Sequence, residues 1–113
     1  MRDKIKNKIL LVTLTKSLKS LDKFPEDRID QKVSAYTQIL LKATEMLTLV
    51  NARIEGMDSK TEKKLKRERD KITLNEKIYK YMSENREFVD QNIKDKFDIF
   101  ESKFLKLKDL LKV

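Results

Sequence analysis

Cysteine, histidine and tryptophan do not occur in this sequence of 113 residues. Without cysteine and histidine, the usual ligands of structural zinc sites and iron–sulfur clusters are missing, and so are thiol catalysis and histidine-based proton transfer. The lack of cysteine also excludes a disulfide framework. We therefore predict no catalytic residue, no metal site and no cofactor.

Glycine and proline occur once each, as Gly56 and Pro25. Tight turns and β-hairpins depend on these two residue types, so a β-rich fold with many turns is excluded. Phosphate-binding loops of nucleotide-binding folds need several glycines, and no glycine-rich turn is present to form an oxyanion hole. We predict that the chain is not an enzyme and that it binds no small-molecule ligand.

Long apolar runs are missing as well. The longest one near the N-terminus covers residues 9–12, and Lys16 follows shortly after it. Such a run is too short for the apolar core of a signal peptide or for a membrane-spanning helix. We expect a soluble intracellular protein, located in the cytoplasm or in the nucleus or nucleoid.

Charged residues make up 41% of the chain and hydrophobic residues 39%. The charged share is well above the roughly 25% of an average globular protein. Long exposed helices explain such an excess, because a thin bundle has more surface per residue than a sphere. The length predicts one helical domain, residues 1–113, with a core of its own.

Apolar residues recur at alternating intervals of four and three residues in two segments. The first row is Ile29, Val33, Tyr36, Leu40, Ala43, Leu47, Val50 and Ile54. The second row is Ile93, Phe97, Phe100, Phe104, Leu107 and Leu111. This spacing is typical of helices whose side chains interlock with those of neighbouring helices. We predict an all-α protein, an antiparallel, coiled-coil-like bundle of three to four long heptad-patterned helices.

Several of the aromatic residues lie at positions of these heptad rows. Phe97, Phe100 and Phe104 could form a platform on which nucleic-acid bases stack. Their heptad positions favour core packing instead. Tyr79 is assigned to the core for the same reason, whereas Tyr81 lies off the row and is expected at the surface or at an interface.

The predicted helices cover residues 3–23, 26–55, 59–83 and 86–112. Pro25 would lie in the first turn of the second helix, and Gly56 would follow its end. Asp58 or Ser59 would cap the third helix. The break near residues 83–85 rests only on polar residues that can cap a helix, so one continuous helix over residues 59–112 remains an alternative.

Some leucines lie off these rows. In the first helix, Ile5, Ile9 and Val12 lie on one face and a row of leucines lies nearly opposite, so the helix is apolar on both sides. Residues that no neighbouring helix covers would form an interface with a partner protein or with a second copy of the chain. The residues predicted at this interface are Leu11, Leu14, Leu18, Leu21, Leu41 and Leu49.

The net charge of +8 is concentrated in residues 1–23 and 60–71. In the second segment, five cations fall within one stripe of a continuous helix and could contact the phosphates of a nucleic acid. They are Lys60, Lys63, Lys64, Arg67 and Lys71. The alternative is a solvated face in which acids neutralise these cations, as in the pairs Glu62–Lys66, Lys64–Glu68 and Arg67–Asp70.

Two further charged groups lie near the N-terminus and in the last predicted helix. Lys4, Lys6 and Lys8 precede an apolar stretch, as in helices that bind membrane surfaces. No tryptophan accompanies them and the apolar residues are split between two faces, so we expect no membrane partner. Asp95, Asp98 and Glu101 lack the histidine of a di-iron site and are expected to pair with lysines such as Lys94 and Lys103.

The leading hypothesis is a non-catalytic scaffold or adaptor subunit that acts through helix–helix contacts with other proteins in a larger assembly. The alternative is a subunit that binds RNA or DNA without sequence preference, through the cationic stripe in residues 60–71.

Overall fold

The computed structural model describes residues 2–25, 27–59 and 61–112. The all-α class is confirmed, since these residues form helices and connecting turns and contain no strand. The elements are α1 (Arg2–Ser20), the short 3-10 turn η1 (Leu21–Lys23), α2 (Ile29–Glu55), α3 (Glu62–Lys66), α4 (Arg69–Glu84), α5 (Arg86–Asn92) and α6 (Lys94–Leu111). No helix in this part of the chain is long and apolar enough to cross a membrane.

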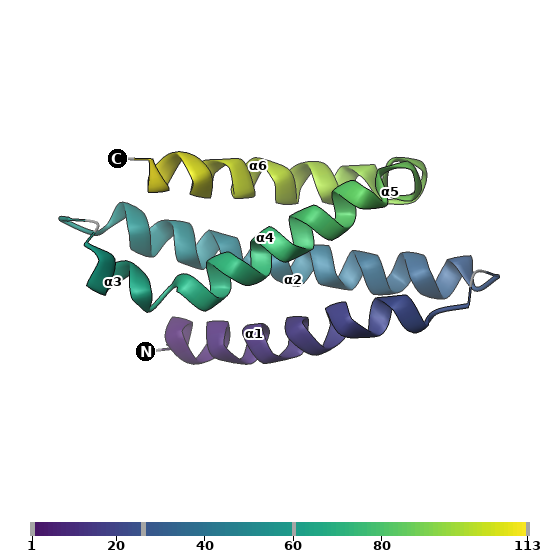
Figure 1. The fold of residues 1–113 in the computed structure, drawn as a ribbon, viewed down its shortest axis with the longest axis horizontal. Coiled ribbons are helices and arrows are strands. Elements are labelled where there is room, and N and C mark those ends of the chain that lie inside the picture. Colours follow the sequence, from purple (N-terminus) through teal and green to yellow (C-terminus); the bar gives the residue numbers. More distant parts are fainter. Residues whose placement is uncertain (1, 26, 60, 113) are drawn as a thin grey trace.

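The long helix α2 lies at the centre of an elongated molecule of 49 × 24 × 19 Å (Figure 1). α1 lies along one side of it and α6 along the other, while α4 crosses obliquely and α5 closes one end. α1 runs antiparallel to α2, as predicted, but α6 runs in the same direction as α2 (Figure 1). Two polar contacts link α2 and α6 in this arrangement: Asn51 donates to the Lys103 carbonyl, and Lys106 pairs with Glu55 at 2.7 Å.

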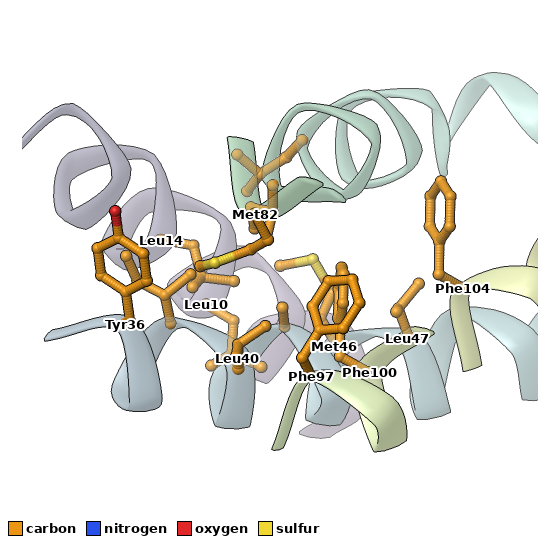
Figure 2. Packing of buried hydrophobic residues seen from close by; sticks show 14 of the residues in the cluster. Leu10, Leu14, Tyr36, Leu40, Met46, Leu47, Met82, Phe97, Phe100 and Phe104 are labelled. Atoms are coloured by element: carbon orange, nitrogen blue, oxygen red, sulfur yellow. The ribbon is translucent and has the colours of Figure 1, made fainter. Parts of the chain in front are cut away.

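The core is a single apolar cluster to which α1, α2, α4, α5 and α6 all contribute. From Tyr36 to Ile54, every residue of the first heptad row is buried, whereas Ile29 at the start of α2 is exposed. In Figure 2, side chains of α2 meet those of the other helices, with Phe97, Phe100 and Phe104 coming from α6. The three phenylalanines are core residues, as predicted, and not a platform for bases.

Tyr79 joins these phenylalanines at the edge of the core. Its ring stacks on Phe104, with 4.6 Å between the ring centroids and 15° between the planes. Its hydroxyl donates to Glu101 at 2.9 Å, and this hydrogen bond, together with burial, raises the pKa of Tyr79. Glu101 therefore pairs with Tyr79, and no lysine in the described ranges lies at ion-pair distance from it. Asp98 pairs with Lys94 as expected, at 3.3 Å.

Two predicted helix starts need correction. α2 begins at Ile29 instead of residue 26, because the Arg28 N–H donates to the Pro25 carbonyl at 3.1 Å and closes a turn before the helix. The cap of the third helix is neither Asp58 nor Ser59. Thr61 caps α3, since its hydroxyl accepts a hydrogen bond from the Lys64 N–H at 3.3 Å.

The continuous helix over residues 59–112 does not form. α4 ends at Glu84, where a break was expected, and a further break at Ile93 separates α5 from α6. An asparagine lies at each break, Asn85 directly before α5 and Asn92 at the end of α5, and each side-chain amide donates to a carbonyl four residues earlier. Asn85 donates to Tyr81 at 2.8 Å and Asn92 donates to Phe88 at 3.0 Å.

Three asparagines are buried inside the bundle, one each on α1, α2 and α4. Asn51 and Asn75 each donate a hydrogen bond to a backbone carbonyl, of Lys103 at 3.1 Å and of Lys71 at 2.8 Å. Asn7 is completely buried, yet within the described part of the chain neither its Oδ1 nor its Nδ2 has a partner. A buried amide without partners costs free energy, because it has lost its hydrogen bonds to water.

We predict that Asn7→Ala stabilises the fold by about 1 kcal/mol, because it removes an unsatisfied amide and improves helix propensity. Urea denaturation followed by circular dichroism measures the change. Asn51→Ala is the matched control, and it should destabilise by about 1 kcal/mol because its amide holds α6. A loss of stability in Asn7→Ala equal to that of the control would show that Asn7 is satisfied.

Candidate functional site

A groove opens at the end of the bundle where α1, the end of α2, α3 and the start of α4 meet. Its volume is about 1190 Å³. It is lined by Lys8, Leu11, Arg53, Gly56, Met57, Asp58, Lys63, Lys64, Arg67, Glu68, Asp70 and Lys71. Twice as many of these side chains are cationic as anionic, so the groove is positively charged.

The floor of the groove contains a buried ion triad of Arg53, Glu68 and Lys71. The Glu68 side chain is only 4% exposed, and its carboxylate accepts from Arg53 at 3.0 Å and from Lys71 at 2.9 Å. The Lys71 ammonium also donates to the Arg67 carbonyl at 3.4 Å. Two cations share one carboxylate, so the triad keeps one positive charge and ties the end of α2 to the start of α4.

The triad overturns part of the predicted cationic stripe. Lys71 is buried and paired instead of exposed, while Lys63, Lys64 and Arg67 are exposed as expected. The physical reason is the interruption between α3 and α4, because residues after it no longer follow the register of a continuous helix. Lys60 lies outside the described residues.

The expected neutralising pairs do not form either. Glu62 lies 3.9 Å from Arg69, and Glu68 binds Arg53 and Lys71. Within residues 61–112 and the other described segments, no carboxylate lies within ion-pair distance of Lys63, Lys64 or Arg67. These three side chains therefore remain available for an external anion.

The second candidate surface is the side of α1 that faces away from the bundle. Leu14 and Leu21 are buried in the core and Leu11 and Leu18 are half-buried, so the leucine face is largely covered by the chain itself. This corrects the prediction that the leucines form an exposed interface. α1 packs against α2 and α4 through its leucines, and that orientation turns the opposite face outward.

The outward face of α1 carries a regular row of residues. Ile5, Ile9 and Val12 are 61%, 62% and 52% exposed. Lys16 and Lys19 continue the same 4-3-4-3 spacing and are exposed as well. We call these five residues the outer row of α1. A row with this spacing lies along one face of a helix and fits the side of a second helix.

The two leucines predicted on α2 do not extend this row. Leu41 is 47% exposed and Leu49 is half-buried. Their eight-residue separation places them about 80° apart around the helix axis, so they do not form one stripe. Their role in an interface remains a prediction.

The sequence reasoning missed Arg53 and Met57 as parts of the groove. Arg53 reaches Glu68 because the chain reverses direction between α2 and α3, and no local pattern signals that reversal apart from Gly56. The 4-3-4-3 spacing of Lys16 and Lys19 after Val12 could have indicated the outer row, but α1 also carries apolar residues on its opposite face.

Comparison with known protein-family models, with curated proteins and with solved structures gave no match.

Proposed function

We propose that this chain is a non-catalytic helical adaptor subunit of a larger assembly, which binds a helix of a partner protein along the outer row of α1. The observation that supports the proposal is the exposure of three aliphatic side chains, Ile5, Ile9 and Val12, in one heptad-spaced row. Isolated exposed apolar residues are common on protein surfaces, whereas an ordered row on one helix is a feature of interaction surfaces.

The charge at the end of the row indicates the kind of partner. Covering the three half-exposed aliphatic side chains contributes roughly 1 kcal/mol each, which is too little for stable binding alone. Lys16 and Lys19 follow at the next two positions, so acidic residues opposite them add attraction and fix the register. The expected partner is an amphipathic helix with two apolar turns followed by glutamate or aspartate.

A second copy of this chain does not fit that description. In a parallel pair of α1 helices, Lys16 and Lys19 would face their own copies across the interface. In an antiparallel pair, the lysines of one copy would lie against Ile5 and Ile9 of the other. Both arrangements place like charges or unpaired charges in the contact, which costs free energy.

The proposal is tested with synthetic helical peptides and the isotopically labelled chain. One peptide carries leucines and then two glutamates at the heptad positions that would face the outer row of α1. The control peptide carries lysines in place of the glutamates. We expect the acidic peptide to shift amide resonances along α1, with at least tenfold tighter binding than the control peptide. Ile9→Lys should abolish this binding, because it places a charge in the middle of the row.

Ile99→Lys is the matched control, since Ile99 is 53% exposed on α6 and outside the row. It should bind the acidic peptide like the unaltered chain. Equal binding of both peptides, or resonance shifts confined to other helices, would contradict the proposal. A stable dimer in sedimentation experiments that Ile9→Lys dissociates would show that the row binds a second copy instead.

A further inference from the structure

The groove at the end of the bundle is a second surface, independent of the outer row of α1. It is concave, and cationic side chains reach it from both α1 and α3. Arg53 and Lys71 are held by Glu68 on its floor. The cations not engaged in this triad are Lys8, Lys63, Lys64 and Arg67, and among the described residues none has a carboxylate at ion-pair distance.

We infer that this groove binds a single strand of nucleic acid. The four free cations hold successive phosphates, and the triad adds a net positive charge beneath them. Leu11 and Met57 also line the groove, and both are partly buried against the core. They offer an apolar surface on which the face of a base can lie, since the polarisable methionine sulfur contacts aromatic rings favourably.

Two features favour a phosphate chain over an acidic peptide. Three of the four free cations are lysines, which act as point charges toward phosphate and do not require the planar geometry with which arginine matches carboxylates. The groove also combines cations with an apolar lining, as surfaces for single-stranded nucleic acid do. Neither feature involves hydrogen bonds to base edges, so binding without sequence preference is expected.

The dimensions favour a single strand over a duplex. The whole bundle measures only 24 × 19 Å across its long axis. We expect a groove at one end of such a narrow molecule to fit one extended chain better than a duplex, because both sides of the groove can then contact the same strand.

The binding experiment uses a fluorescently labelled 15-nucleotide oligo(dT) and the full chain, with anisotropy measured at several salt concentrations. We expect a dissociation constant of about micromolar at low salt. The affinity should fall with salt at a slope of roughly −2.8, because each of four phosphate contacts on a single strand contributes about −0.7.

The double variant Lys63→Glu/Lys64→Glu should weaken binding by tenfold or more and bring the slope to roughly −1.4. Both lysines are exposed and make no ion pair with a described residue, so the fold should be unaffected, which thermal unfolding checks. The matched control is Lys77→Glu/Lys80→Glu, on the exposed part of α4 outside the groove. It changes the net charge by the same amount and should reduce affinity much less.

Three results would overturn the inference. The first is the absence of binding at low salt, and the second is an equal loss of affinity in both double variants. The third is tighter binding of a duplex than of the single strand. Competition experiments show which kind of polyanion the groove prefers. Inorganic polyphosphate should compete more weakly than unlabelled oligo(dT), because it lacks bases for Leu11 and Met57. A poly-glutamate peptide that competes as well as oligo(dT) would show that the groove takes acidic peptides.

Discussion

Replacing Glu68 with glutamine should destabilise the folded chain by about 3 kcal/mol, because it leaves two cations near each other without their counter-charge. The Lys71 side chain is only 11% exposed, so water cannot replace the lost carboxylate well. Arg53 is 28% exposed and can turn partly to solvent. We therefore expect the lower end of the roughly 3–5 kcal/mol that the loss of one partner of a buried ion pair usually costs. The free energy of unfolding in urea measures the effect.

Two further variants test whether the unpaired charges cause this loss of stability. Glu62→Gln is the matched control, since Glu62 is a glutamate of the same segment whose side chain is 91% exposed, and it should change stability by less than about 0.5 kcal/mol. The triple variant Arg53→Met/Glu68→Met/Lys71→Met removes all three charges together. It should recover most of the stability lost in Glu68→Gln, because no unpaired charge remains. A stability of Glu68→Gln equal to that of Glu62→Gln would show that the triad contributes little.

Phe100→Ala should have the largest effect of the substitutions considered, a loss of about 3–5 kcal/mol. Phe100 is completely buried, and its ring lies between those of Phe97 and Phe104, at centroid distances of 6.2 and 6.1 Å. Removing the ring leaves a cavity between α2 and α6, and the rigid α2 backbone limits how far the neighbours can close it.

A chain of this size has a stability of roughly 5–15 kcal/mol, so Phe100→Ala could remove most of it. Phe100→Leu provides a graded comparison, because it keeps most of the apolar volume and should cost less than half as much. Ile99→Ala, at the exposed neighbouring position, should change stability by less than about 0.5 kcal/mol. Similar losses at positions 99 and 100 would contradict the assignment of the core face of α6.

The sequence predicted the core better than it predicted the surfaces. Spacing alone identified Tyr36, Leu40 and Phe97 as buried, because the period of a helix determines which residues share a face. The same spacing could not decide which side of α1 is buried, since both sides are apolar. That choice depends on how α1 packs against α2 and α4, which only the three-dimensional arrangement shows.

The groove also shows what helical spacing alone cannot predict. Lys63, Lys64 and Arg67 were predicted as exposed cations from their spacing, but Lys71 was misplaced because an uninterrupted helix was assumed. At the break, Arg53 of α2 and Lys71 of α4 hold Glu68 in the groove floor. Local propensity carries no information about a partner fifteen residues earlier in the chain. The break at Ile93 was not predicted, although asparagine, present here as Asn92, is unfavourable inside helices because its side chain competes for backbone hydrogen bonds.

The parallel packing of α2 and α6 has a consequence for the synthesis of the protein. These two helices share the most extensive helix–helix contact in the structure, yet α3, α4 and α5 lie between them in the sequence. On the ribosome, α2 is synthesised before α6. Until residues 94–111 follow, the phenylalanines that cover one side of α2 do not yet exist, and that apolar side has no cover from α6.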